Sequence, residues 1–378
     1  MTRQHTVVFI AAMMVIPWIR STLGVILPGM IDTYDLTISQ AGLVSIFLES
    51  GSVTGMLALG FVIDRIGAAR IVVWGLPVIG TALFAVTVAP AFGILAVMLF
   101  LVGIGVALTA SGVNTVMAAT GEQRAFYLGL LHSCFSIFAI VTPLIAGALL
   151  TASDWQTFYF GVAVIALFMM ILFRIIGYTA ATEQTTGEKP TSGAIGAALK
   201  RITTVCLGVF ALAGVQGIII TWSYLYMVNV HGLSHGLATL APSSLWVGIL
   251  VMRSVSIALS RRHSARTILL WSIAGSIAVV AFEQMMLLPI VSMTAMVLLG
   301  MGVAGAFQLG TAWAAERIPD RISTASSAIM ASAALGIGVL PWLTGITIDA
   351  TDYSGMMVVS LGGMILAALM FGITAQTK

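Results

Sequence analysis

Four ionisable side chains lie deep within apolar stretches of the sequence, and they are of the types that bind anions and move protons. They are Arg20, Glu49, His132 and Arg253. If these stretches cross a membrane, a charge at mid-depth costs at least about 2.5 kcal/mol by insertion scales. Each side chain therefore needs a partner, a water-filled cavity or a function. Arginine offers a cation to an anionic ligand, whereas glutamate and histidine offer sites for a proton.

Arg20 and Glu49 occupy similar depths in two consecutive stretches, 7–31 and 40–62. Arg20 precedes the end of the first by roughly 16 Å and Glu49 follows the start of the second by roughly 14 Å, at the helical rise of about 1.5 Å per residue. Two antiparallel helices would bring them together. The pair is then either a fixed buried ion pair, or a site where Arg20 binds an anionic solute and Glu49 exchanges a proton. An acid held by arginine releases its proton readily and regains it when the arginine turns to a solute, which would couple the two events.

Arg253 and His132 each lie within two helical turns of one end of their stretches, 238–259 and 126–151. A long arginine side chain near a helix end can reach the membrane interface. Arg253 is thus either an interfacial residue or a second anion contact. His132 is either a structural hydrogen-bonding residue or a protonatable neighbour of that contact.

The composition places the chain in lipid rather than in water. Of its 378 residues, 60% are hydrophobic and 8% are charged, whereas about 25% of residues are charged in a soluble domain. The net charge of +3 therefore indicates membrane sidedness and not nucleic-acid binding. We find no P-loop, no paired nucleophile and base, and no metal cluster in the sequence, so we expect no enzyme, no cofactor and no metal site. Cys134 and Cys206 are expected to be small buried side chains.

The elements that must position these residues are membrane-spanning helices of about 20 residues each. Apolar windows divided by Pro, Gly or charge predict twelve of them, with the first retained because it contains Arg20 and lacks a cleavage pattern. The predicted spans are 7–31, 40–62, 70–89, 92–117, 126–151, 156–178, 203–229, 238–259, 267–287, 290–313, 324–348 and 355–375. We therefore expect an all-α integral membrane protein.

The basic residues predict which side each loop faces. With the N-terminus in the cytoplasm, every one of the 16 lysines and arginines except Arg20 and Arg253 falls at a cytoplasmic helix end. The charged residues of the opposite loops are all acids, such as Asp154 and Asp352. This asymmetry follows the positive-inside rule. It predicts a multi-pass protein of the inner (plasma) membrane with both termini cytoplasmic.

The chain reads as two pseudo-symmetric halves of six helices. The polar stretch 179–202 is expected to be a cytoplasmic linker between an N-terminal half, 1–178, and a C-terminal half, 203–378. Gly103-Ile-Gly105-Val-Ala107 reappears 197 positions later as Gly300-Met-Gly302-Val-Ala304. Duplicated halves of this kind are typical of secondary transporters.

The loop after the second span carries a family motif, Gly60-Phe-Val-Ile-Asp64-Arg65-Ile-Gly67-Ala-Ala-Arg70. It resembles the loop 2–3 signature of the major facilitator superfamily, although Ala68 and Ala69 stand where the family often has basic residues. The resemblance implies a gating role at the cytoplasmic side for five residues of this loop. They are Gly60, Asp64, Arg65, Gly67 and Arg70. The span-4 motif of the family's drug–proton exporters places an arginine where this chain has Leu99, which disfavours a multidrug exporter.

The resemblance also implies that spans 1, 4, 7 and 10 line a central solute path. Gln216 and Tyr224 in span 7 and Gln308 in span 10 are then candidate solute contacts, or else helix–helix hydrogen-bonding residues. His231 and His235 follow span 7 with a spacing that suits a metal pair. No third ligand accompanies them, so we expect an exposed loop pair.

Together these features predict a proton-coupled secondary active transporter that works by alternating access and moves a small organic anion or carboxylate-bearing solute. An exporter of amphipathic, drug-like or lipid-like compounds is the first alternative, indicated by the methionine-rich and weakly charged interior. A non-transporting membrane sensor or scaffold is the second. The expected partners are a small solute, protons and membrane lipid, and the chain is expected to act as a monomer.

Overall fold

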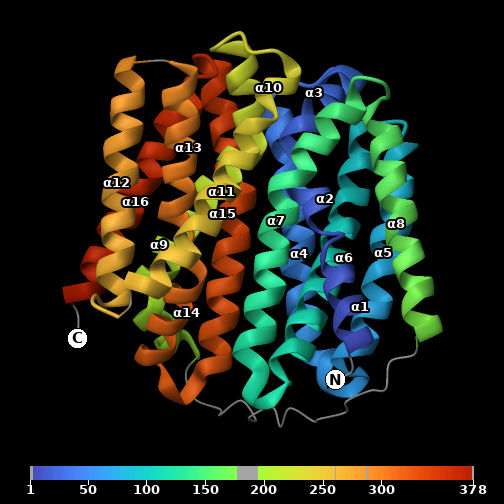
Figure 1. Cartoon of the computed structure of the whole chain (residues 1–378), viewed down its shortest axis with the longest axis vertical. Coiled ribbons are helices and arrows are strands. Elements are labelled where there is room, and N and C mark those ends of the chain that lie inside the picture. Colours follow the sequence, from blue (N-terminus) through green and yellow to red (C-terminus); the bar gives the residue numbers. More distant parts are fainter. Residues whose placement is uncertain (1–2, 177–194, 260, 287, 377–378) are drawn as a thin grey trace. The chain divides into compact units, whose positions relative to one another are not determined.

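The computed structural model describes residues 3–176, 195–259, 261–286 and 288–376, and every regular element in these ranges is a helix. Contacts divide the chain into two compact units (Figure 1). Unit 1 comprises Met1–Asp35 and Phe47–Glu188, and unit 2 comprises Leu36–Ile46 and Lys189–Lys378. Most of the expected linker, 179–194, lies outside the described residues.

Unit 1 is built from the helices of the N-terminal part of the chain. They are α1 (Arg3–Met13), α2 (Pro17–Arg20), α3 (Leu23–Tyr34), most of α4 (Ile38–Ile66), α5 (Ala68–Thr87), α6 (Phe92–Ala118), the 3-10 turn η1 (Gly121–Gln123), α7 (Arg124–Leu150) and α8 (Trp155–Ile176). Fully buried aliphatic and aromatic side chains such as Leu76, Ile79 and Tyr159 form its core.

Unit 2 is built from the helices of the C-terminal part. They are α9 (Ile195–Asn229), α10 (His235–Ala238), α11 (Leu240–Leu259), α12 (Ala265–Met286), α13 (Pro289–Val303), α14 (Ala306–Arg317), the 3-10 turn η2 (Pro319–Arg321), α15 (Ile322–Ala350) and α16 (Gly355–Gln376). Trp222, Tyr226 and Phe371 are among its fully buried side chains.

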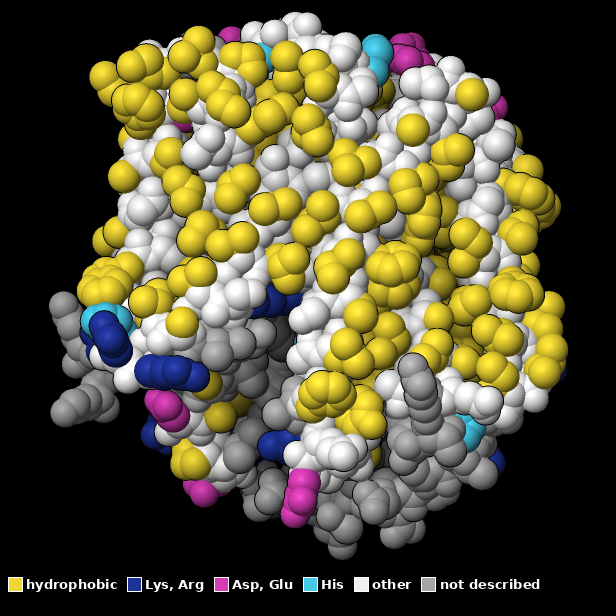
Figure 2. Space-filling view, in the orientation of Figure 1, with side chains coloured by type: hydrophobic (Ala, Val, Ile, Leu, Met, Phe, Trp, Pro, Cys, Tyr) yellow, Lys and Arg dark blue, Asp and Glu magenta, His cyan; other side chains and the backbone are white. Residues whose placement is uncertain are grey.

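The helix lengths and hydropathy confirm the predicted all-α membrane fold. Among the described residues, eleven helices are long and apolar enough to cross a membrane, and the count is twelve if the bent pair at the N-terminus is one span. On the face seen in Figure 2, hydrophobic side chains cover most of the surface between the two ends of the molecule. Large apolar side chains such as Trp271 and Phe126 are more than half exposed, as a lipid-facing surface requires.

The first predicted span, 7–31, is wrong as a single continuous helix. The segments Gln4–Arg20 and Leu23–Tyr34 meet at a bend of 48°. The helix is interrupted at 14–16, where Pro17 then starts the short α2, and again at Ser21 and Thr22. Proline cannot donate to the preceding turn, so it is tolerated at the first position of a new helix. The break places Arg20 at the end of α2.

Glycines bring pairs of helices into backbone contact at matching positions of the two units. In unit 1, a Cβ on Gly51 of α4 would lie 1.9 Å from the Phe100 carbonyl oxygen of α6. In unit 2, a Cβ on Gly248 of α11 would lie 1.9 Å from the Val297 carbonyl oxygen of α13. Each unit 2 residue follows its unit 1 counterpart by 197 positions, the period of the sequence repeat. Such close crossings of small residues are a common way for membrane helices to pack.

The N-terminal part of α4, Ile38–Ile46, belongs to unit 2, and its start packs on the end of α15. The Asp349 carboxylate accepts the backbone N–H groups of Ile38 (3.2 Å) and Ser39 (2.8 Å). These N–H groups have no partner within their own helix, and an acid at a helix N-terminus also interacts favourably with the helix dipole. Asp349 therefore caps α4 from the neighbouring helix.

Candidate functional site

The predicted contact between Arg20 and Glu49 is confirmed inside unit 1. An Arg20 terminal nitrogen lies 2.7 Å from Glu49 Oε2 and donates a second hydrogen bond to Ser52 Oγ at 3.0 Å. The Glu49 side chain is 4% exposed, whereas that of Arg20 is 29% exposed. One partner of the pair is therefore buried while the other still reaches open space.

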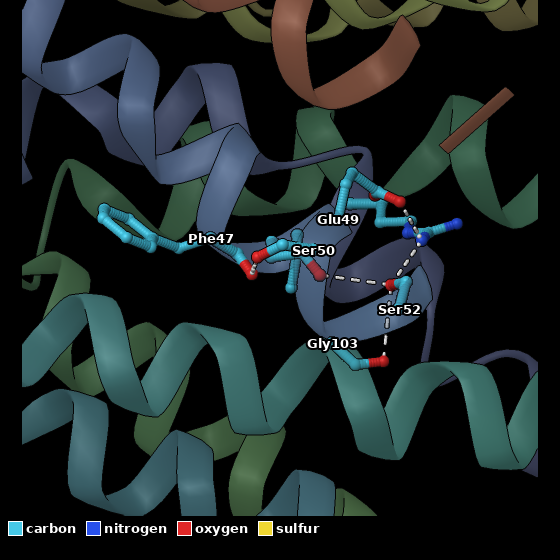
Figure 3. Close-up of polar contacts among 7 residues, drawn as sticks. Phe47, Glu49, Ser50, Ser52 and Gly103 are labelled. Carbon is cyan, nitrogen blue, oxygen red and sulfur yellow. Dashed lines mark hydrogen bonds and ion pairs between the residues drawn. The ribbon is translucent and has the colours of Figure 1, made fainter. Parts of the chain in front are cut away.

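Ser52 ties this pair to the close crossing of α4 and α6. Its hydroxyl can donate to the carbonyl oxygens of Leu48 (3.2 Å) or Gly103 (3.3 Å) while it accepts from Arg20. Figure 3 shows Glu49 and Ser52 extending from α4, with a dashed line from Ser52 to Gly103 below. Because Gly103 has no side chain, α6 approaches closely enough for this bond. The helix packing thus fixes where the Arg20 guanidinium is held.

The helix break beside Arg20 leaves hydrogen-bonding capacity unused. Among the described residues, the buried Arg20 Nε and Ser21 Oγ have no hydrogen-bond partner. Thr22 Oγ1, by contrast, donates to the Trp18 carbonyl at 2.7 Å and so restores one bond lost at the break. Discontinuous helices with unsatisfied polar groups are typical of solute sites in membrane transporters. The Arg20 region therefore offers donors that a bound solute can use.

A second candidate site lies in unit 2, where the structure brings Arg253 and Gln308 together. Both line a cavity of about 250 Å³. The other lining residues are Met252, Ser256, Ile268, Leu269, Ser272, Ala304, Gly305 and Leu309. Ala304 and Gly305 separate α13 from α14, so this cavity also lies at a break between two helices. Its walls are apolar apart from one cation, one amide and two hydroxyls.

The polar groups of this cavity can hold an anion. The hydroxyls of Ser256 and Ser272 donate to carbonyls of their own helices, at 3.0 and 2.8 Å, so each would have to turn its hydrogen toward an anion to bind it. The Arg253 guanidinium has the fork geometry that pairs with a carboxylate through two parallel hydrogen bonds. The Gln308 amide, on an exposed side chain, adds a donor and an acceptor. The cavity thus suits a small solute with one carboxylate.

The other predicted solute contacts lie in α9. The Tyr224 hydroxyl lies 2.7 Å from His235 Nδ1, and the two rings are stacked. The hydroxyl that was expected to contact the solute therefore has the His235 imidazole as its partner. Gln216 is half-buried in the same helix. His231 contacts Ser292 instead, at 2.8 Å, so the two histidines of the predicted loop pair have different partners.

The remaining predicted residues belong to unit 1. His132 is half-buried in α7, and its carbonyl accepts the Ser136 hydroxyl at 3.0 Å. Gly67 has a φ of 88°, which only glycine adopts freely and which lets the chain turn into α5. Arg70 is exposed in the first turn of that helix. Three further motif positions lie outside the residues whose side chains are described, namely Gly60, Asp64 and Arg65.

Sequence analysis missed one buried acid, Glu283 in α12. Its side chain is fully buried, and its carboxylate accepts the hydroxyls of Tyr226 and Ser292. A signal was present, because Glu283 is the only charged residue between Arg266 and Glu316. It stands near the end of the predicted span 267–287, where an acid is ordinarily interfacial. The structure instead places it among hydrogen-bond donors.

Comparisons with known proteins agree with this architecture. The Major Facilitator Superfamily family model matches residues 9–282. The glucose/mannose transporter GlcP of Bacillus subtilis is 22% identical over 344 residues, which are 86% of this chain and 84% of that protein. The cis,cis-muconate transport protein of Acinetobacter baylyi is 27% identical over 143 residues, 37% of this chain and 34% of that protein.

Two solved structures of transporters have the same fold along the whole chain. The nucleoside transporter NupG superposes with a TM-score of 0.80 at 13% identity, over 99% of both chains. The transporter FucP in its outward conformation superposes with a TM-score of 0.67 at 17% identity, again over 99% of both chains. At these identities the likeness establishes the fold alone.

Proposed function

Since the chain belongs to the Major Facilitator Superfamily of membrane transporters, we propose that it couples proton movement to the transport of a small organic anion or carboxylate-bearing solute. The observation that carries this proposal is the contact between Arg20 and Glu49 at a break in the first span. The pair holds one cation, one protonatable acid and unused donors at one place. We further propose that it works by alternating access as a monomer in the inner membrane, with both termini cytoplasmic.

The coupling follows from competition for the Arg20 guanidinium. While Glu49 is ionised, its carboxylate occupies Arg20 at 2.7 Å. A proton on Glu49 removes the charge attraction and frees the guanidinium for the carboxylate of a solute. Loss of that proton restores the original pair and displaces the solute. Binding of a proton and binding of an anion thereby favour each other.

The cavity of unit 2 supports the choice of a carboxylate. Arg253 lines it beside hydroxyl and amide groups, and a cation held among apolar walls attracts an anion more strongly than it would in water. The cis,cis-muconate transport protein resembles a third of this chain, and muconate is a dicarboxylate. We propose Arg253 and Gln308 as contacts for the solute, with Gln216 and Tyr224 as further candidates.

A neutral sugar is the second candidate solute, because GlcP matches this chain over 84% of its own length. Sugar hydroxyls both donate and accept, so they can bind an Arg–Glu pair without separating it. Such a solute would bind while Arg20 and Glu49 remain in contact. The two candidates thus differ in whether the contact between Arg20 and Glu49 must open.

Uptake into proteoliposomes tests the proposal. Purified chain is reconstituted, an inward proton gradient is imposed, and radiolabelled cis,cis-muconate, a monocarboxylate and glucose are compared. We expect carboxylate accumulation that is abolished when an ionophore collapses the gradient. Accumulation of glucose alone would support the second candidate, and counterflow without a response to the gradient would contradict proton coupling. Empty liposomes and the Arg20→Ala variant are the controls.

A further inference from the structure

Glu283 is a buried acid that the Arg20 site does not use. The side chain is fully buried in α12. Oε1 accepts the Tyr226 hydroxyl and the Ser292 hydroxyl, the latter at 2.6 Å, and Oε2 accepts the Gln284 amide at 2.7 Å. These neutral groups donate three hydrogen bonds, and none of the described residues that hydrogen-bond to the carboxylate is a cation. Such an arrangement accommodates either charge state of the acid, since hydroxyl groups can turn.

The hydrogen bonds of Ser292 define a direction for proton transfer. Its hydroxyl has one hydrogen, which it donates to Glu283. His231 Nε2 lies 2.8 Å from the same oxygen, so in the tautomer with a hydrogen on Nε2 it donates to Ser292. The result is a chain of three groups, His231 to Ser292 to Glu283, in which each donates to the next. The bonds join a buried acid to a half-buried imidazole in the segment between α9 and α10.

We propose that Glu283 is a second proton-binding site, which exchanges its proton with the solution through Ser292 and His231. In the loading step, His231 takes a proton from water at Nδ1 and becomes an imidazolium. Its Nε2–H bond then breaks as a new O–H bond forms at Ser292, while the original Ser292 proton passes to Glu283 Oε1. His231 is left neutral, Ser292 keeps one hydrogen and Glu283 is neutral. The reverse sequence releases the proton.

The position of these three hydrogen-bonded groups identifies the side from which the proton comes. His231 precedes α10, which lies at the end of unit 2 opposite the C-terminus (Figure 1). In the proposed orientation this is the outer side, so the site would load from the exterior. Its part in driving uptake rests on the proposed function, but proton binding itself does not.

The neighbouring ionisable groups do not compete for this role. Tyr226 contacts the carboxylate directly, and its ring packs edge-on against that of His231 at a centroid distance of 5.3 Å. The charge of Asp352 acts on Tyr226, but the Asp352 carboxylate accepts the Ser354 backbone N–H at 2.7 Å. His235 is engaged with Tyr224. Of the two histidines, His231 is thus the one that hydrogen bonds join to Glu283, through Ser292, in the part of the chain that the structure describes.

Infrared difference spectroscopy tests the site without any solute. The purified full-length protein in lipid nanodiscs is stepped from mildly alkaline to mildly acidic buffer, and the carbonyl band of a protonated buried carboxyl is followed with time. Glu49 can contribute to the same band, so all measurements are repeated in a Glu49→Gln background. We expect Glu283→Gln to remove the remaining band. Ser292→Ala should slow its appearance by about a hundredfold, the lower range for a positioned proton-transfer group.

Matched variants separate the relay from general damage. Ser276→Ala removes a buried α12 hydroxyl that donates only to backbone carbonyls, and His235→Gln removes the other imidazole; both should leave the rate unchanged. If Glu283→Gln does not fold, as judged by gel filtration, Tyr226→Phe serves instead; it removes one hydroxyl that the carboxyl group accepts and should shift the frequency of the band. A band of full size in Glu283→Gln, or wild-type rates in both Ser292→Ala and His231→Gln, would overturn the proposal. A band that behaves as expected in a protein without carboxylate uptake would contradict the proposed function alone.

Discussion

The two units place their buried charges differently. Unit 1 holds a cation and an acid in one contact, with Arg20 at 2.7 Å from Glu49. Unit 2 keeps them in separate places: Arg253 lines a cavity with apolar, hydroxyl and amide neighbours, whereas Glu283 is held by Tyr226, Ser292 and Gln284. One unit therefore contains a self-balanced pair, whereas the other separates a cation that lines a cavity from a buried acid.

This difference arises on a shared scaffold. The crossing of α4 and α6 at Gly51 has its counterpart in the crossing of α11 and α13 at Gly248, at the same repeat spacing. The position equivalent to Glu49 is Trp246, 197 residues later. The backbone arrangement has thus been kept while the charged side chains have changed. The glycines thus specify the packing that the two units share, whereas the charged side chains distinguish one unit from the other.

The largest expected effect is the loss of one member of the Arg20–Glu49 pair. Glu49→Ala leaves a partly buried guanidinium without its counter-charge, and we expect the free energy of unfolding to fall by about 3–5 kcal/mol. The double variant Arg20→Ala/Glu49→Ala should recover most of this stability, because no lone charge remains. Thermal unfolding in detergent measures the stability of Glu49→Ala, Arg20→Ala and the double variant.

Transport then separates a structural pair from a functional one. We expect the double variant to be stable and inactive, and Glu49→Gln to retain solute exchange while losing accumulation driven by protons. A stable double variant that still concentrates solute against its gradient would show that the pair only supports the fold. In that case unit 1 would contribute packing, and the binding chemistry would lie in unit 2.

The contact of Arg20 with Glu49 could be predicted because depth in a membrane helix follows from residue count. The rise per residue and the two predicted boundaries fixed both depths to within about one turn. The break in the first span could not be predicted in the same way. Proline is tolerated inside membrane helices when neighbours satisfy the freed backbone groups, so Pro17 alone does not show where a helix is interrupted.

Side-chain partners near helix ends were the least predictable part of the site. Tyr224 and Glu283 both stand within two turns of a predicted end, where a side chain can face the bundle, the loop or the interface. Tertiary contacts decide among these, and the sequence does not contain them. His235 engages Tyr224, while Tyr226 and Ser292 engage Glu283. By contrast, Arg253 and Gln308 had both been predicted as candidate solute contacts, and they line one cavity.

A second, smaller effect is expected in the cavity of unit 2. If Arg253 binds the solute carboxylate, Arg253→Ala removes a charge-assisted hydrogen bond of about 1.5–3 kcal/mol. The KM of the transported carboxylate should then rise about 10- to 100-fold. Gln308→Ala removes a neutral contact and should raise KM less, by about threefold to tenfold.

An exposed arginine provides the control for this cavity. Arg261 lies in the turn after α11 and is exposed, so Arg261→Ala changes the net charge equally but leaves the cavity intact. Equal KM values for Arg253→Ala and Arg261→Ala would contradict the anion site. Arg253→Lys should have an intermediate KM, because lysine keeps the charge but not the fork.

The smallest effect is expected in acid, and it distinguishes the proton site of unit 2 from the pair in unit 1. His231 lies between the spans Ala198–Asn229 and His235–Ser256. Burial lowers the pKa of its imidazole below the ordinary value of 6.5, and the nearby charge of Glu283 opposes this shift only in part. The folded state then binds fewer protons than the unfolded chain as the pH falls through 6.5, so the contribution of His231 to stability is complete above that pH and is lost below it.

His231→Gln should therefore lower the acid sensitivity of Tm by less than about 2 °C, because solvent screens a partly exposed imidazole. His235→Gln, which removes an exposed imidazole that contacts Tyr224, serves as the control in a pH series of melting curves. If His231→Gln melts with the same pH dependence as the wild type, the fold does not favour the neutral imidazole, and the acid response must come from other ionisable groups.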